Sequence, residues 1–198
     1  SSAVAQEALS PIQVLSYGGA SLLQLLDIPC VDSTVMNAPG ILTAAAGYSA
    51  GWSGCTLFRS DDEGQTWNGV QGFLAPGCTV GMATNTISTA SRYTVDSGNV
   101  MNVRLLSGGM SSVTQDAMLN GANHFAYGAP GRWEIIAAQA CVIQGDGTYK
   151  LSGLLRGRFG TEQYMSTHAI WDSLVLLDAA EVRFIGLNIA SLNISRRW

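Results

Sequence analysis

The stretch "RWEIIAAQACVIQGDGTYKLSGLL", from Arg132 to Leu155, contains two apolar segments separated by a turn. Asp146-Gly147 between them is a strong hairpin signal, because glycine readily adopts the positive φ of a tight turn. Simple alternation along each segment predicts that every second side chain shares one face. The expected faces are Trp133, Ile135, Ala137, Gln139, Cys141 and Ile143 on the first segment, and Tyr149, Leu151, Gly153 and Leu155 on the second.

Short strands separated by turn residues are expected on both sides of this hairpin. The segment "VMNVRLL" alternates, with Met101, Val103 and Leu105 on one face, which is typical of a half-buried strand. Other segments with strand character are "ILTAAAG", "CTLFR", "CTVGMA", "SLVLL" and "EVRFIGL". Two short helices are expected, in "TQDAMLNG", with Thr114 as N-cap, and in "TEQYMSTHA", from Thr161. The pattern predicts a mainly β fold, an antiparallel β-sandwich or a distorted barrel.

The composition limits the classes of partner. Of the 198 residues only 12% are charged, whereas an ordinary soluble domain carries about a quarter. We therefore expect part of the surface to be buried against other subunits. No apolar run reaches the length of a membrane span, and a net charge of −4 with scattered basic residues argues against nucleic acid.

The chain is expected to form a single domain, residues 1–198, with a weak possible seam near 96–99. Because it begins with Ser1 and ends in "NISRRW", we expect it to be a segment of a longer protein. The cysteines Cys30, Cys55, Cys78 and Cys141 lack the close spacing of a zinc site, so no metal is expected. They are expected to be free thiols, and a Cys55–Cys78 bridge requires the two strands to be neighbours.

The segment "SDDEGQTW" has the pattern of an Asp-box, a motif that also occurs in secreted carbohydrate-processing proteins. Asp62 and Ser60 can bond backbone groups of a tight turn, and Gly64 supplies a positive φ. Thr66 and Trp67 begin the returning strand, with Trp67 packed beneath the turn. Since the pattern occurs once, it indicates a hairpin turn and not a repeated propeller blade.

Neither an enzyme nor a cofactor site is predicted. Glycoside hydrolysis requires two facing carboxylates, but Asp61, Asp62 and Glu63 crowd one turn. The other acids, Asp116, Glu134, Glu162 and Asp172, stand in no motif. The two histidines, His124 and His168, are expected in loops, bonded to backbone.

Two further groups of residues are candidates for contacts. In "LLRGRFGTE" we expect the strand to kink at Gly157 and Gly160 and Glu162 to pair with Arg156 or Arg158; alternatively, the arginines grip an acidic partner. Aromatic residues could form a sugar platform, for which the candidates are Trp52, Tyr48 and Tyr127. Trp133 alternates with strand residues and is assigned to the core.

The run from Met118 to Asp178 resembles the C-terminal part of phage tail-tip proteins, the baseplate hub or host-specificity family that includes gene-transfer-agent tail proteins. The most specific part is Leu-Leu-Arg-Gly-x-x-Gly-Thr-Glu, and the upstream order from Gly40 is also similar. The matching positions are Gly121, Ala122, Asn123, Trp133, Glu134, Leu151, Leu154, Leu155, Arg156, Gly157, Gly160, Thr161, Glu162, His168 and Asp178. Many relatives have a second basic residue where Phe159 stands.

The resemblance implies a structural component of a phage tail, made in the host cytoplasm and carried in the virion. It implies assembly with other tail proteins, commonly as a homotrimer, and a part in host attachment. It transfers no catalytic residue. The alternative, from another class, is a carbohydrate-binding module that recognises host surface glycan. The third hypothesis is that the chain is a fragment of a sugar hydrolase.

Overall fold

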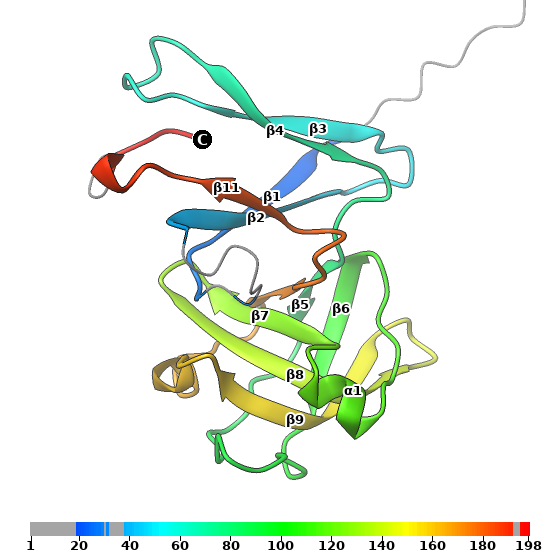
Figure 1. Ribbon diagram of the computed structural model, residues 1–198. Helices are drawn as coiled ribbons and strands as arrows, with labels where there is room; N and C mark the ends of the chain where they lie inside the picture. Colours follow the sequence, from blue (N-terminus) through cyan, green and yellow to red (C-terminus); the bar gives the residue numbers. More distant parts are fainter. Residues whose placement is uncertain (1–18, 30, 32–37, 192–194) are drawn as a thin grey trace, which may run out of the picture.

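The computed structural model describes residues 19–29, 31, 38–191 and 195–198 (Figure 1). Strands dominate this part of the chain, as the sequence predicts. The elements are β1 (Ser21–Leu26), β2 (Gly40–Gly47), β3 (Gly54–Arg59), β4 (Asn68–Leu74), β5 (Val80–Ala83), β6 (Met101–Ser107), α1 (Gln115–Leu119), β7 (His124–Ala129), β8 (Arg132–Ile143), β9 (Tyr149–Arg158), η1 (Glu162–Tyr164), β10 (Ser173–Leu176), β11 (Arg183–Gly186) and η2 (Ile189–Ser191).

Six strands close into an antiparallel barrel in the order β10-β5-β6-β9-β8-β7. The predicted mainly β fold is therefore confirmed, in the form of a barrel. Its interior is apolar and contains Met101 and Val103, and Leu105, the third residue predicted to share that face of β6, is partly buried and packs against the same cluster. Phe125, Leu151 and Leu174 fill the same interior from other strands. Closure leaves these six strands without a free edge, which removes sites of unwanted strand pairing.

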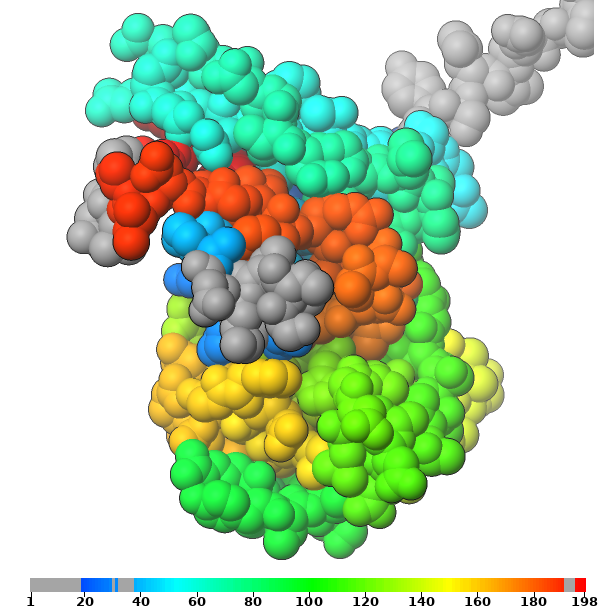
Figure 2. All heavy atoms as spheres, in the orientation of Figure 1, coloured from blue at the N-terminus to red at the C-terminus, as the bar shows by residue number. Residues whose placement is uncertain are grey.

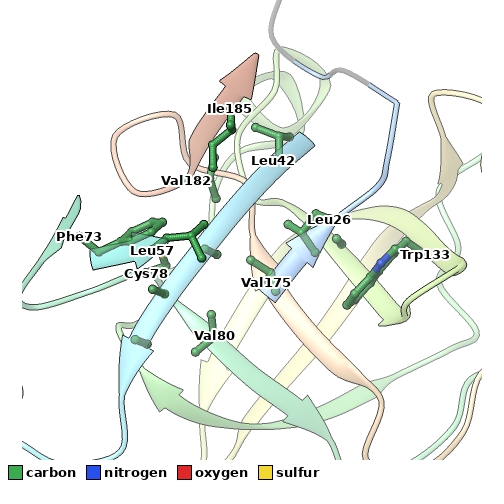
Figure 3. Close-up of a cluster of buried hydrophobic side chains, with 14 of the residues drawn as sticks. Leu26, Leu42, Leu57, Phe73, Cys78, Val80, Trp133, Val175, Val182 and Ile185 are labelled. Atoms are coloured by element: carbon green, nitrogen blue, oxygen red, sulfur yellow. The ribbon is translucent and has the colours of Figure 1, made fainter. Parts of the chain in front are cut away.

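The remaining strands form a second layer above the barrel (Figure 1). One sheet has the order β1-β2-β11, and β3 and β4 form a hairpin that projects at the top of the space-filling view (Figure 2). A second apolar cluster joins this layer to the barrel (Figure 3). Leu26, Leu42 and Phe73 enter this cluster from the upper layer, and Val80 and Trp133 enter it from the barrel. Trp133 is a core residue, as predicted.

The β8–β9 hairpin forms where it was predicted, but its faces differ from simple alternation. Ile136 and Ala138 lie in the barrel interior together with Cys141 and Leu151, whereas Trp133 lies in the cluster between the layers. The register shifts between Ile135 and Ala137. Gly153 has a φ of +64°, and a Cβ there would lie 3.2 Å from that of Gln139. These two irregularities move the apolar face from one parity of residues to the other.

The segment around residues 96–99 lies between β5 and β6, which belong to the same barrel. Asp96 forms a β-bridge with Leu154 of β9, so the chain is not divided there. The strands instead change from the upper layer to the barrel after β4, near the turn at Gly77.

The expected helices are present in reduced form. In α1 the Thr114 hydroxyl accepts a hydrogen bond from the amide of Ala117 at 3.1 Å, which confirms the N-cap. The second expected helix is the single 3₁₀ turn η1, and Thr161 provides no side-chain cap for it. Cys55, Cys78 and Cys141 are free thiols, so Cys55 and Cys78 are not bridged. Cys30 lies outside the described residues.

Candidate functional site

A network of buried charged side chains is built on strands of the barrel, with Glu134 of β8 at its centre. Its Oε1 accepts hydrogen bonds from Arg156 Nε and from the Gly157 amide, both at 2.8 Å. Its Oε2 accepts from Arg156 Nη2 at 2.8 Å and lies 2.6 Å from His168 Nε2. The side chains of Glu134 and Arg156 are fully buried. Two parallel bonds of this kind hold a guanidinium and a carboxylate in one fixed orientation.

Arg156 continues the network to a neighbouring loop. Its Nη1 donates to the carbonyl of Ser88 at 2.8 Å and lies 3.5 Å from Asp96 Oδ2. The Asp96 carboxylate also accepts bonds from the amides of Gly98 and Asn99 at 3.0 Å. Arg156 therefore connects β9 to the long loop between β5 and β6 at two points, Ser88 and Asp96.

His168 connects Glu134 to a second ion pair. Its Nδ1 lies 3.6 Å from Asp172 Oδ2, and Tyr127 stacks on its ring with centroids 4.0 Å apart. Asp172 accepts two bonds from Arg132, at 2.6 and 2.5 Å, and one from the Ala169 amide at 2.8 Å. The segment before β10 is thus held to β8 at both His168 and Asp172.

Ionisation of both carboxylates is favoured by this arrangement. Burial alone would raise the pKa of Glu134, but hydrogen bonds from His168 and Arg156 outweigh it and hold that pKa below its usual value. Asp172 behaves in the same way, since burial is outweighed by the bonds from Arg132 and the Ala169 amide, and its pKa is lowered. Each charge is therefore compensated inside the protein.

The predicted partner of Arg156 is wrong. Glu134 pairs with Arg156, while Glu162 forms an ion pair with Arg92 at the surface. The alternative, in which the arginines grip an acidic partner, is wrong for Arg156 because its side chain is fully buried. Arg158 remains partly exposed beside Phe159.

The rest of the "LLRGRFGTE" motif supports the network. Gly157 and Gly160 both have positive φ, +56° and +81°, as expected for kinks. The Thr161 hydroxyl accepts a bond from the Ile135 amide at 2.9 Å and donates to the Arg158 carbonyl at 2.8 Å. The motif therefore ties β8 to the end of β9.

Sequence reasoning did not connect Glu134, His168 and Asp172. A signal was present, because Glu134 is the single acid in an apolar strand, and a buried carboxylate requires a partner. The expectations for the two histidines hold only in part. His168 lies in a loop, as expected, but its ring contacts the side chain of Glu134. His124 is buried in strand β7 and does not lie in a loop. Burial lowers the pKa of His124, and a hydrogen bond with the Gly121 backbone offsets part of this decrease.

The network offers no open chemical site at Glu134. Both oxygens of Glu134 are bound by Arg156, the Gly157 amide and His168. The side chains of Glu134, Arg156 and His168 are all buried. Across the described residues, no group of three or more histidine, cysteine, aspartate or glutamate side chains could hold a metal ion. We therefore read the network as a framework for the barrel and its loops.

The three predicted binding aromatics separate in the structure. The prediction of an accessible Tyr127 is wrong, since this residue is buried in the barrel interior. The prediction that Trp52 forms an exposed platform is also wrong. Only 5% of its surface is accessible, and its Nε1 donates a hydrogen bond to Ser21 Oγ at 2.8 Å. Tyr48 is 55% exposed. Tyr48 and Trp52 nevertheless line the same pocket.

The Asp-box forms the turn of the β3–β4 hairpin. Ser60 Oγ accepts from the Gly64 amide at 2.8 Å, and Asp62 accepts from the Thr66 amide and hydroxyl at 2.8 and 2.6 Å. Trp67 is not packed beneath the turn: it is 47% exposed, and its Nε1 donates to the Gly64 carbonyl at 3.2 Å. The structural interpretation of the motif is confirmed, apart from the place of this indole.

The end of the chain pairs with this hairpin, as the trace near the C mark shows (Figure 1). Ser60 and Arg197 exchange backbone hydrogen bonds at 2.9 and 3.2 Å. Arg196 Nε lies 2.5 Å from Asp61 Oδ1, and Arg59 binds the same carboxylate. Asp61 thus joins the Asp-box turn to the C-terminal segment.

An acid titration monitored by NMR tests the role of Asp62. Hydrogen bonds from the Thr66 hydroxyl and amide lower the pKa of Asp62 to about 2. Because this pKa is depressed in the folded state, the contribution of Asp62 is present above about pH 4 and is lost as the pH falls through about 2. We expect the Thr66 amide resonance to titrate with that midpoint. A midpoint near the ordinary aspartate value of 3.8 would contradict the turn geometry.

Fold and network together define a closed β-barrel whose framework includes a buried ion network. Residues 78–175 match the family described as Rcc01698-like, C-terminal. The matched segment begins just before β5 and ends within β10, so it takes in five barrel strands, most of β10 and the network. The chain is similar to that family over this part, just under half its length. No curated protein matches the chain.

Proposed function

We propose that the chain is a structural component of a bacteriophage tail tip or baseplate, where it acts in assembly and host attachment. The observation that carries the proposal is the place of "LLRGRFGTE", the most specific part of the resemblance to tail-tip proteins. Its Arg156, Gly157 and Thr161 build the framework of the barrel and form no open reaction site. This structural use of the motif is compatible with a protein that works as a building block, and the assignment to a tail rests on the resemblance.

Features of the upper layer also support assembly. In the described part, β1, β3, β4 and β11 each have a ladder partner on one side only. Unpaired strand edges are templates for pairing with another chain. Exposed apolar side chains, such as Leu74 on β4 of this layer and Ile143 on β8 of the barrel, add surface that a partner would cover. The sparse charge of the whole chain fits the same proposal.

The proposed location is the tail of the virion, after synthesis in the host cytoplasm, and the proposed partners are other tail proteins and further copies of the chain. Within the described residues, no helix combines the length and the apolar character required to cross a membrane.

The oligomeric state of the full-length parent protein tests the proposal. We expect light scattering after gel filtration to give the mass of a homotrimer, or of a complex with tail proteins. Because few charged groups are available for the contacts, the assembly should persist at 1 M NaCl, where ion pairs are screened. A parent protein that stays monomeric at all concentrations would count against this function.

A carbohydrate-binding module is a second candidate function, and one observation favours it. Tyr48 and Trp52, two of the three aromatic residues picked out for glycan binding, line a common pocket.

A further inference from the structure

We propose that the pocket beside Tyr48 is a binding site for an uncharged sugar ring. This Tyr48 pocket has a volume of about 560 Å³ and is formed by three segments: the loop after β2, the turn after β4 and the end of β6. Its volume falls within the range of roughly 300–1,000 Å³ typical of small-molecule sites. The inference goes beyond the assembly role and does not depend on it.

Trp52 gives the pocket a rigid wall. A Cβ at Gly47 would lie 2.1 Å from the Trp52 Cβ, and one at Gly77 would lie 2.9 Å from Trp52 Cζ3. The indole is therefore packed between two residues without side chains, and its Nε1 bond to Ser21 fixes its orientation. A wall held in this way loses little conformational entropy when a ligand binds.

Tyr48 supplies the exposed aromatic surface. Its amide donates to the Ala20 carbonyl at 3.1 Å, which fixes the backbone of the loop after β2, while the side chain stays 55% exposed. The face of an aromatic ring carries partial negative charge. The C–H groups on one side of a pyranose carry partial positive charge, so they can stack on such a face.

Polar groups in the pocket suit hydroxyl groups and not ions. The lining residues are Gly47, Tyr48, Ser49, Ala50, Trp52, Ala75, Pro76, Leu106 and Ser107, none of which is charged. An ionised ligand would lose hydration there without a countercharge. Ser107 Oγ donates to the Pro76 carbonyl at 3.1 Å, which leaves its oxygen free to accept a bond from a sugar hydroxyl. The ligand class that fits is a neutral hexose or N-acetylhexosamine unit.

Ligand-observed NMR titration with neutral methyl glycosides tests the proposal. The probes are the methyl glycosides of glucose, galactose, mannose and N-acetylglucosamine, with glucuronic acid and glucosamine as charged comparators. We expect saturable binding of at least one neutral probe, and affinity about tenfold lower in Tyr48→Ala, since stacking and burial are both lost. Tyr48→Leu should also lose affinity, because it retains bulk without the ring.

Tyr93→Ala is the matched control. Tyr93 is 80% exposed, does not line the pocket, and contacts Arg92, so its removal should leave affinity unchanged. The proposal is overturned if no neutral probe binds the wild type, or if a charged probe binds more tightly than its neutral counterpart. Equal losses in the Tyr48 and Tyr93 variants, or full affinity in Tyr48→Leu, would also overturn it. None of these outcomes bears on trimer formation, so the two proposals can fail separately.

Discussion

Glu134→Ala is expected to lower the free energy of unfolding by about 3–5 kcal/mol, the cost of leaving a buried partner charge uncompensated. Arg156 would lose two hydrogen bonds to the carboxylate while its side chain stays fully buried. Its remaining contacts, the Ser88 carbonyl and Asp96, compensate it only in part. Chemical denaturation monitored by fluorescence and circular dichroism would measure the change.

Glu162→Ala is the matched control, because Glu162 is the partner that sequence proximity favours for Arg156. Its ion pair with Arg92 is partly exposed, and such pairs typically contribute about 0–1 kcal/mol. We therefore expect little loss. Comparable losses in the two variants would contradict the assignment of Glu134 as the partner. The double variant Glu134→Leu, Arg156→Met should recover much of the stability, since it removes both buried charges together.

The pH dependence of stability should follow from the same carboxylate. The folded-state pKa of Glu134 lies below its usual value of 4.5, because bonds from His168 and Arg156 outweigh burial. Its contribution is therefore fully present above that value and is lost as the pH falls through the folded-state pKa. In Glu134→Ala the acid branch of the stability curve should be shallower than in the wild type.

Gly157→Ala is expected to be the second strongly destabilising change, by about 3 kcal/mol. Gly157 has a φ of +56°, and a Cβ there would lie 2.8 Å from Glu162 Cα, a backbone atom that cannot rotate away. The left-handed conformation costs a non-glycine residue roughly 1–2 kcal/mol, and overpacking adds roughly 1–3 kcal/mol. The shift would also displace the Gly157 amide, which donates to Glu134. Thermal and chemical unfolding would measure the loss.

Gly160→Ala separates backbone strain from the steric clash. Gly160 has a φ of +81°, but a Cβ there would meet no atom within 4 Å. Only the strain remains, so we expect a loss of roughly 1–2 kcal/mol. If the two glycine variants were equally unstable, the close approach of Glu162 to Gly157 could not be the cause.

Features that depend on neighbouring residues could be predicted from the sequence. The β8–β9 hairpin with its Asp146-Gly147 turn, the N-cap at Thr114 and the Asp-box turn all rest on contacts within a few positions. The faces of β8 and β9 could not be predicted by alternation, because the register shift near Ile135 and the positive φ of Gly153 reverse the parity along the hairpin.

The candidate sites show the same division. Tyr48 and Trp52 stand only four positions apart in the sequence, but the burial of Trp52 depends on Gly77 and Ser21, from other parts of the chain. Its role therefore changed from an exposed platform to the wall of a pocket. Tyr127 is the third candidate for glycan binding, and closure of the barrel places it in the interior.

By itself, the sequence determined the strands, the turns and the mainly β class, since alternation and turn chemistry act over short distances along the chain. Only the tertiary structure decided which charges meet. Glu162 is six positions from Arg156, yet Arg156 binds Glu134, which lies on the adjacent strand. Sheet pairing brings Glu134 and Arg156 together in a space closed to water, where an unpaired charge is most costly. The residues that flank Glu134 and Arg156 in the sequence do not indicate that these two side chains pair.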